Sequence, residues 1–118
     1  MDAEGLKDLF APFGAVTVKR MFGGHGIYAD GLCFAIESRG EVFVKVDADN
    51  EPDFVAAGSK PFVYEAKGKR MSMAYRLLAA IAYDDEDELK LWAGLGLGAA
   101  RRSAAAKAKP KAKLKKPK

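Results

Sequence analysis

A stretch of alternating apolar residues between positions 16 and 46 is interrupted by two turn-forming dipeptides, Asp30-Gly31 and Arg39-Gly40. An Asp-Gly pair between apolar runs is among the strongest short-range signals for a β-hairpin, because tight hairpin turns need residues that tolerate positive φ angles. The residues around the two turns, together with the alternation over 16–21, predict three antiparallel strands in a meander. In the last of these strands Val42, Val44 and Val46 share one face.

The segment 22–26, Phe-Gly-Gly-His-Gly, contains three glycines in five residues and predicts a bulge or a tight bend. It lacks the Lys-Ser/Thr pair of a phosphate-binding loop and is not placed before a helix. Its glycine spacing does not fit a dinucleotide-binding fingerprint, and no Gly-x-Ser-x-Gly nucleophile accompanies it elsewhere in the chain. We therefore expect these glycines to serve the backbone.

Helical signals lie on both sides of the meander. An apolar stripe over 6–13 predicts a first helix capped by Asp2, and a short second helix is expected between Asp47 and Gly58. From a cap at Asp85, a final helix is expected to bury one side, which consists of Leu89, Trp92, Ala93, Gly96 and Ala99.

A second hairpin is expected between the last two helices, with strands at 62–65 and 71–75 around a turn at 67–69. The resulting order is α-β-β-β-α-β-β-α. It predicts an α+β fold of two layers, in which helices cover one antiparallel sheet.

Charge divides the chain at about residue 100. Residues 1–100 carry 11 cations and all 16 acids, a net charge of −5, whereas residues 101–118 carry nine cations and no acid. We expect a folded domain over 1–100 and a disordered Lys/Ala/Pro-rich tail over 101–118, because like charges and few apolar residues oppose packing. The tail is predicted to bind nucleic acid non-specifically, unless it only aids solubility, through Arg101, Arg102, Lys107, Lys109, Lys111, Lys113, Lys115, Lys116 and Lys118.

Four segments together resemble the TfoX N-terminal domain family: residues 20–31, 43–47, 58–64 and 68–75. The resemblance runs from about the first helix to Trp92 and implies an α+β two-layer fold. The name-giving members are bacterial regulators of natural competence, and a helical C-terminal domain follows this one in them. Here a lysine-rich segment follows instead. The resemblance implies a non-enzymatic regulatory or accessory module and supplies no catalytic residues to transfer.

His25 and Cys33 are the residues best suited to catalysis, as a base beside a thiol. The predicted hairpin places them at unequal offsets from the Asp30-Gly31 turn, and no third residue that would orient the base is evident. We therefore predict no catalytic site, no metal site and no cofactor. The alternative is a small-ligand binder or an enzyme that uses the glycine-rich hairpin around His25.

A second set of cations could form a basic patch if both strand pairs belong to one sheet: Lys19, Arg20, Lys67, Lys69 and Arg70. Solvated, scattered charges are the plainer interpretation of this set. Cys33 is the single cysteine, and the sequence shows neither a signal peptide nor an apolar run long enough to span a membrane. We expect a cytoplasmic protein with an unknown protein partner and no membrane contact.

Overall fold

The computed structural model describes residues 1–21, 23–66 and 69–113. Its six strands form one antiparallel sheet in the order β1-β2-β3-β4-β6-β5. The strands are β1 (Thr17–Met21), β2 (Gly24–Ala29), β3 (Leu32–Ser38), β4 (Glu41–Lys45), β5 (Pro61–Ala66) and β6 (Lys69–Leu77). The helices are α1 (Ala3–Phe10), α2 (Glu51–Ala56), the 3-10 helix η1 (Ala80–Tyr83) and α3 (Glu86–Lys113). The predicted α+β class and antiparallel sheet are confirmed.

Both predicted turns of the meander are present. Asp30 and Gly31 have φ angles of 53° and 77°, and Arg39 and Gly40 have φ angles of 54° and 83°. Two consecutive positive φ angles match the twist of antiparallel strands, which explains why each turn needs only two residues. The meander has one strand more than predicted, because β2 occupies the glycine-rich segment.

The expected bend at Gly24-His25-Gly26 is wrong, since these residues lie in β2. Their glycines permit close approach: a Cβ on Gly24 would lie 1.9 Å from the carbonyl oxygen of Glu37, and one on Gly26 would lie 2.5 Å from Met21 Sδ. A shift in the β2–β3 register occurs one step later, between Ile27 and Tyr28. The glycines therefore serve the backbone as expected, but by relieving crowding within a strand.

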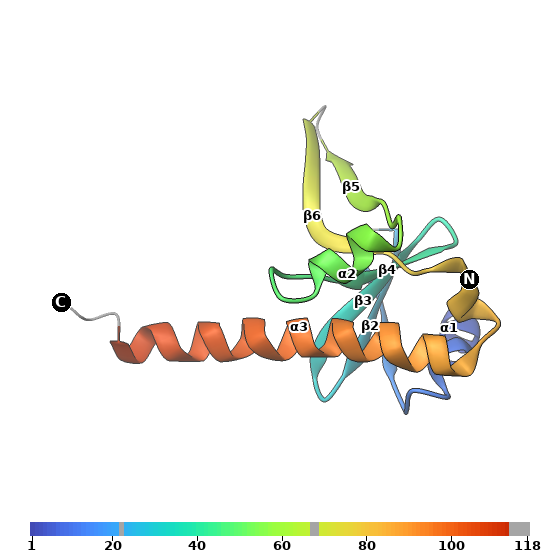
Figure 1. The fold of residues 1–118 in the computed structure, drawn as a ribbon, viewed down its shortest axis with the longest axis horizontal. Helices are drawn as coiled ribbons and strands as arrows, with labels where there is room; N and C mark the ends of the chain where they lie inside the picture. Colours follow the sequence, from blue (N-terminus) through green and yellow to red (C-terminus); the bar gives the residue numbers. More distant parts are fainter. Residues whose placement is uncertain (22, 67–68, 114–118) are drawn as a thin grey trace.

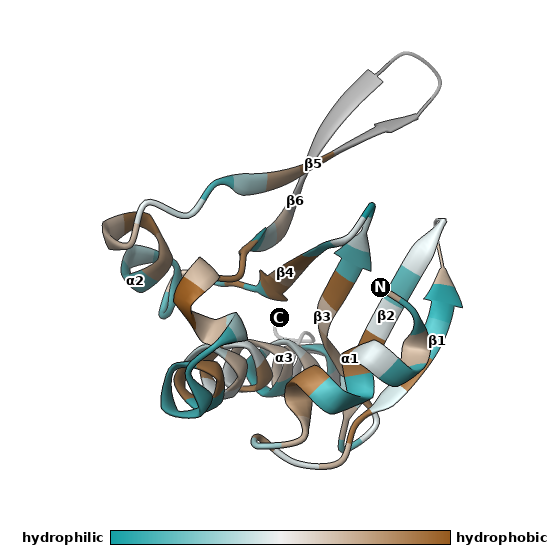
Figure 2. Ribbon diagram, turned by 90° about the vertical axis from the view of Figure 1, so that its right-hand side faces the viewer, coloured by the Kyte–Doolittle hydropathy of each residue, from teal (hydrophilic) through white to brown (hydrophobic). Residues whose placement is uncertain are grey.

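The helices α1 and α3 lie on the same side of the curved strands β1–β4 (Figure 2). α3 packs across β3 and β4, and α1 packs beside β1 and also contacts α3. The β5–β6 hairpin points away from α3 (Figure 1). Within the described residues, α1 and α3 thus cover one face of the sheet.

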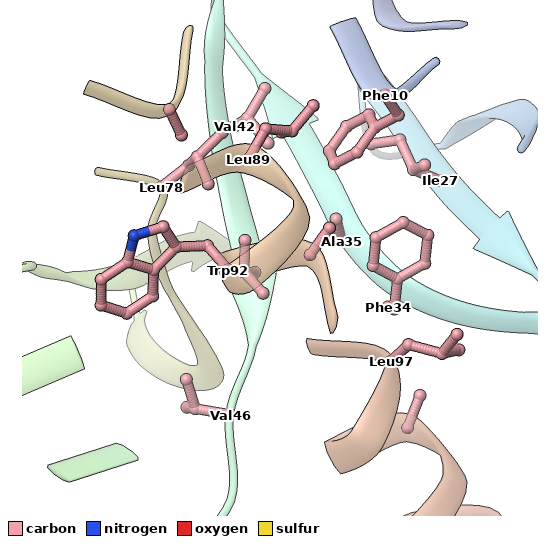
Figure 3. Packing of buried hydrophobic residues seen from close by; sticks show 14 of the residues in the cluster. Phe10, Ile27, Phe34, Ala35, Val42, Val46, Leu78, Leu89, Trp92 and Leu97 are labelled. Atoms are coloured by element: carbon pink, nitrogen blue, oxygen red, sulfur yellow. The ribbon is translucent and has the colours of Figure 1, made fainter. Parts of the chain in front are cut away.

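Aromatic side chains join the helices to the sheet in the core (Figure 3). Phe10 of α1 meets Phe34 of β3 edge-on, with ring centroids 5.4 Å apart. Trp92 of α3 meets Phe54 of α2 at 4.7 Å and is only 8% exposed. The predicted inner side of α3 is confirmed, because its residues are all buried: Leu89, Trp92, Ala93, Gly96 and Ala99.

α3 begins as predicted at Asp85, whose carboxylate accepts hydrogen bonds from the backbone N–H groups of Asp87 and Glu88. It then continues through residues 101–113, where a disordered tail was expected. Alanines around Arg101 and Arg102 have the highest helix propensity, and both arginines are paired with acids of the folded body. After Lys113 the disordered tail stays a prediction.

Candidate functional site

His25 and Glu37 form a little-exposed pair at one end of the β2–β3 ladder. His25 Nδ1 lies 2.6 Å from Glu37 Oε1, and the side chains are 16% and 5% exposed. The second oxygen of Glu37 accepts a hydrogen bond from the backbone N–H of Gly40 at 2.8 Å. The amino group of Met1 is 4.0 Å from the same oxygen. Each oxygen of this carboxylate therefore has a donor close to it.

The balance of these contacts sets the charge of Glu37. Burial by itself raises the pKa of a carboxyl group, since it disfavours the charged form. The hydrogen bonds from His25 and Gly40 and the nearby N-terminus outweigh burial, so the pKa of Glu37 is lowered from its ordinary value. The ionised carboxylate consequently ties the β3–β4 turn, β2 and the start of the chain together.

The structure does not bring His25 and Cys33 together. His25 lies two residues before the core residue Ile27 and shares its face of β2, whereas Cys33 pairs with Tyr28 on the opposite face. The Cys33 thiol instead donates to the carbonyl oxygen of Ala35 at 3.4 Å. His25 is therefore not placed to act as a base for the thiol.

Two of the nine predicted nucleic-acid-binding cations are engaged with the folded body. Arg101 contacts Asp30 through Nη2 at 2.5 Å. Arg102 donates from Nε and Nη2 to the two carboxylate oxygens of Asp47, at 2.6 and 2.9 Å, and its Nε lies 3.1 Å from Asp49. These arginines fasten α3 to the turns at 30–31 and 47–50. Two cations of the basic segment are therefore paired with acids of the body, and seven lysines, from Lys107 onward, follow them in the sequence.

Those seven lysines all follow Arg101 and Arg102 in the sequence. Figure 1 shows α3 extending past the sheet toward the C-terminus. Lys107 is exposed, and the last turns of α3 also contain Lys109, Lys111 and Lys113. The remaining predicted residues, Lys115, Lys116 and Lys118, lie outside the described part of the chain.

The second predicted basic set is divided by the topology. Lys19 and Arg20 lie exposed on β1, at one edge of the sheet. Lys69 and Arg70 lie at the start of β6, with β2, β3 and β4 in between, and Lys67 lies outside the described residues. The backbone does not place the two groups side by side, and a joint role for them stays a prediction.

A comparison with family profiles matched residues 8–100 to the TfoX N-terminal domain. The chain belongs to the TfoX N-terminal domain family. A comparison with curated proteins found no match. The part of this chain that matches the TfoX N-terminal domain includes Asp30 and Asp47 and ends just before Arg101. The acids that hold α3 therefore lie inside the family domain, whereas their arginine partners lie just after it.

The sequence did not reveal the part played by Asn50 in this TfoX N-terminal domain. Asn50 is 2% exposed, and its Nδ2 donates to the carbonyl oxygens of Lys45 and Leu95 at 3.2 and 2.8 Å. Its Oδ1 accepts from the backbone N–H of Asp47 at 2.8 Å. The contact with Leu95 joins segments 45 residues apart and leaves no local signal in the sequence.

Within residues 1–21, 23–66 and 69–113, no group of three or more His, Cys, Asp or Glu side chains is placed to hold a metal ion. The same part of this TfoX N-terminal domain protein contains no helix with the length and apolar character that crossing a membrane requires.

Proposed function

We propose that this protein is a non-catalytic regulatory or accessory module that contacts nucleic acid through the lysines from Lys107 to Lys118. Membership in the TfoX N-terminal domain family supports the regulatory or accessory role. The nucleic-acid contact rests on one observation. Arg101 and Arg102 are held by acids of the body, while seven lysines follow them without a single acid in the sequence.

The body and the lysine-rich segment carry net charges of opposite sign. The body up to residue 100 carries a net charge of −5, so its total charge opposes the approach of a polyanion, whereas the lysine-rich end attracts one. Lysines contact phosphates as point charges and release the counterions bound there. Sequence preference should be weak, because base recognition requires side chains fixed in a groove.

The test compares full-length protein with a variant in which all seven lysines from Lys107 to Lys118 are replaced by glutamine. Duplex affinity of the natural protein should fall with salt, with log K decreasing by about 0.9 per neutralised phosphate for each decade of salt. The glutamine variant should lose most of the affinity and the salt dependence. Lys7→Gln with Lys90→Gln, two exposed lysines of the body, serves as the control. Equal affinities for the natural protein and the glutamine variant would refute the proposal.

A further inference from the structure

The face of the sheet opposite α1 and α3 carries its own set of side chains. Ile27, Ala35 and Val44 are paired across β2, β3 and β4, and all belong to the core beneath the helices. Successive residues of a strand point to opposite faces, so Tyr28 and Lys45 point away from the core. Cys33 pairs with Tyr28, and Tyr75 pairs with Lys45, which places these residues on the same outer face.

Two lysines lie over the tyrosines of this outer face. Lys19 Nζ is 5.0 Å from the centre of the Tyr28 ring, and Lys45 Nζ is 5.3 Å from the centre of the Tyr75 ring. The Tyr75 hydroxyl donates to Cys33 Sγ at 3.8 Å. Both rings are half-buried, and burial is the main reason that the pKa of each phenol is raised. Aromatic surface and positive charge therefore lie side by side. Both phenols are neutral at physiological pH, because their pKa values are raised.

Two described carboxylates, at the ends of the strands that carry this face, are paired. Asp30, in the turn after β2, is bound by Arg101, and Glu41, at the start of β4, lies 3.5 Å from Lys60. Among the described side chains, the ion pairs do not include Lys19 or Lys45. Among the described side chains, Lys19, Lys45 and the two tyrosines thus give the outer face a cationic and aromatic area, on a body whose total charge is negative.

We propose that the outer face binds single-stranded nucleic acid, with bases stacking on Tyr28 and Tyr75 and phosphates meeting Lys19 and Lys45. Stacking on aromatic side chains needs unstacked bases, which a single strand offers and a duplex withholds. A second copy of this chain fits less well, because two such faces would bring lysines of like charge together. The proposal deepens the proposed function: the lysine-rich end attracts nucleic acid of either kind, and the outer face selects single strands.

The first experiment measures binding of full-length protein to a labelled single strand and to the duplex of the same sequence by fluorescence anisotropy. Tyr28→Leu keeps an apolar side chain but removes the stacking surface. It should weaken single-strand binding by about fivefold or more and leave duplex binding unchanged. Tyr83→Leu, at an exposed tyrosine on η1, is the matched control and should change neither affinity. Lys19→Gln with Lys45→Gln, a change of charge alone, should weaken single-strand binding more than duplex binding.

The second experiment uses Cys33, the single cysteine, as a reporter at the centre of this face. A bound single strand should slow the reaction of Cys33 with a small thiol reagent, and the duplex at equal occupancy should not. Equal losses for single strand and duplex in the Tyr28 variant, or no protection of Cys33, would overturn the inference. The failure of the proposed function would appear differently, as duplex binding that does not depend on the lysines from Lys107 to Lys118.

Discussion

Arg102 of α3 holds Asp47 with a two-pronged hydrogen bond, Nε to Oδ2 at 2.6 Å and Nη2 to Oδ1 at 2.9 Å. Asp47 Oδ1 also accepts from the backbone N–H groups of Asp49 and Asn50. One carboxylate therefore organises the turn before α2 and fixes α3 against it. The hydrogen bond from Arg102 is the main reason that the pKa of Asp47 is lowered.

Asp47→Ala should destabilise the protein more than Arg102→Ala does. The aspartate variant loses the contact with Arg102 and also leaves the backbone donors of Asp49 and Asn50 without their acceptor. Urea unfolding of both single variants and the double variant measures this difference. The double variant should resemble Asp47→Ala, since Asp47→Ala by itself already removes the contact with Arg102. Equal effects of the two single changes would show that the turn does not depend on Asp47.

Gly96→Ala and Gly94→Ala should have opposite effects on stability, although both replace a glycine within α3. A Cβ on Gly96 would lie 2.3 Å from Val44 Cγ1 and 3.0 Å from the carbonyl oxygen of Phe34, so the helix must move off the sheet. We expect a loss of about 1–3 kcal/mol in the free energy of unfolding. A Cβ on Gly94 meets nothing within 4 Å, and the gain in helix propensity should stabilise by about 1 kcal/mol. Thermal and urea unfolding distinguish the two results.

Trp92→Ala should lower the free energy of unfolding by about 3–5 kcal/mol, as large aromatic truncations in cores do. The indole packs on Phe54, and its Nε1 donates to Glu88 Oε1 at 3.0 Å. Trp92→Phe keeps part of the packing and should cost less. Because Trp92 is the single tryptophan, fluorescence of the natural protein should report a buried indole. Emission typical of water, with a silent alanine substitution, would contradict this packing.

Glu37→Gln should reduce stability at neutral pH and change its dependence on acid. The folded-state pKa of Glu37 is lowered from its ordinary value of 4.5. Ionisation of Glu37 therefore stabilises the folded protein at pH values above 4.5. This contribution is lost as pH falls through the folded-state pKa. The gap in stability between the natural protein and Glu37→Gln should therefore be largest near neutral pH and should shrink below about pH 4. Urea unfolding over a series of pH values tests this, and a gap that does not change with pH would contradict it.

The turn dipeptides, the apolar side of α3 and the caps at Asp2 and Asp85 could be predicted because each depends on residues close in sequence. The segregation of charge needs no structure at all. These local signals were sufficient for the α+β class and for the separation of His25 from Cys33. Cys33 pairs with Tyr28, which lies three residues after His25 on β2, so the two side chains point to opposite faces of the sheet. They could not show that Gly24 and Gly26 continue a strand, since glycine by itself favours a turn as readily.

The tertiary structure alone decided which residues meet. A two-residue turn at Asp30-Gly31 by itself would pair His25 with Ile36, and the register shift after Ile27 brings Glu37 there instead. Arg101 and Arg102 belong by composition to the basic segment, yet they bind acids 71 and 55 residues away. The physical reason is the same in both cases. Register and helix position are set by packing of the whole sheet against α3, and charge pairing follows from that geometry.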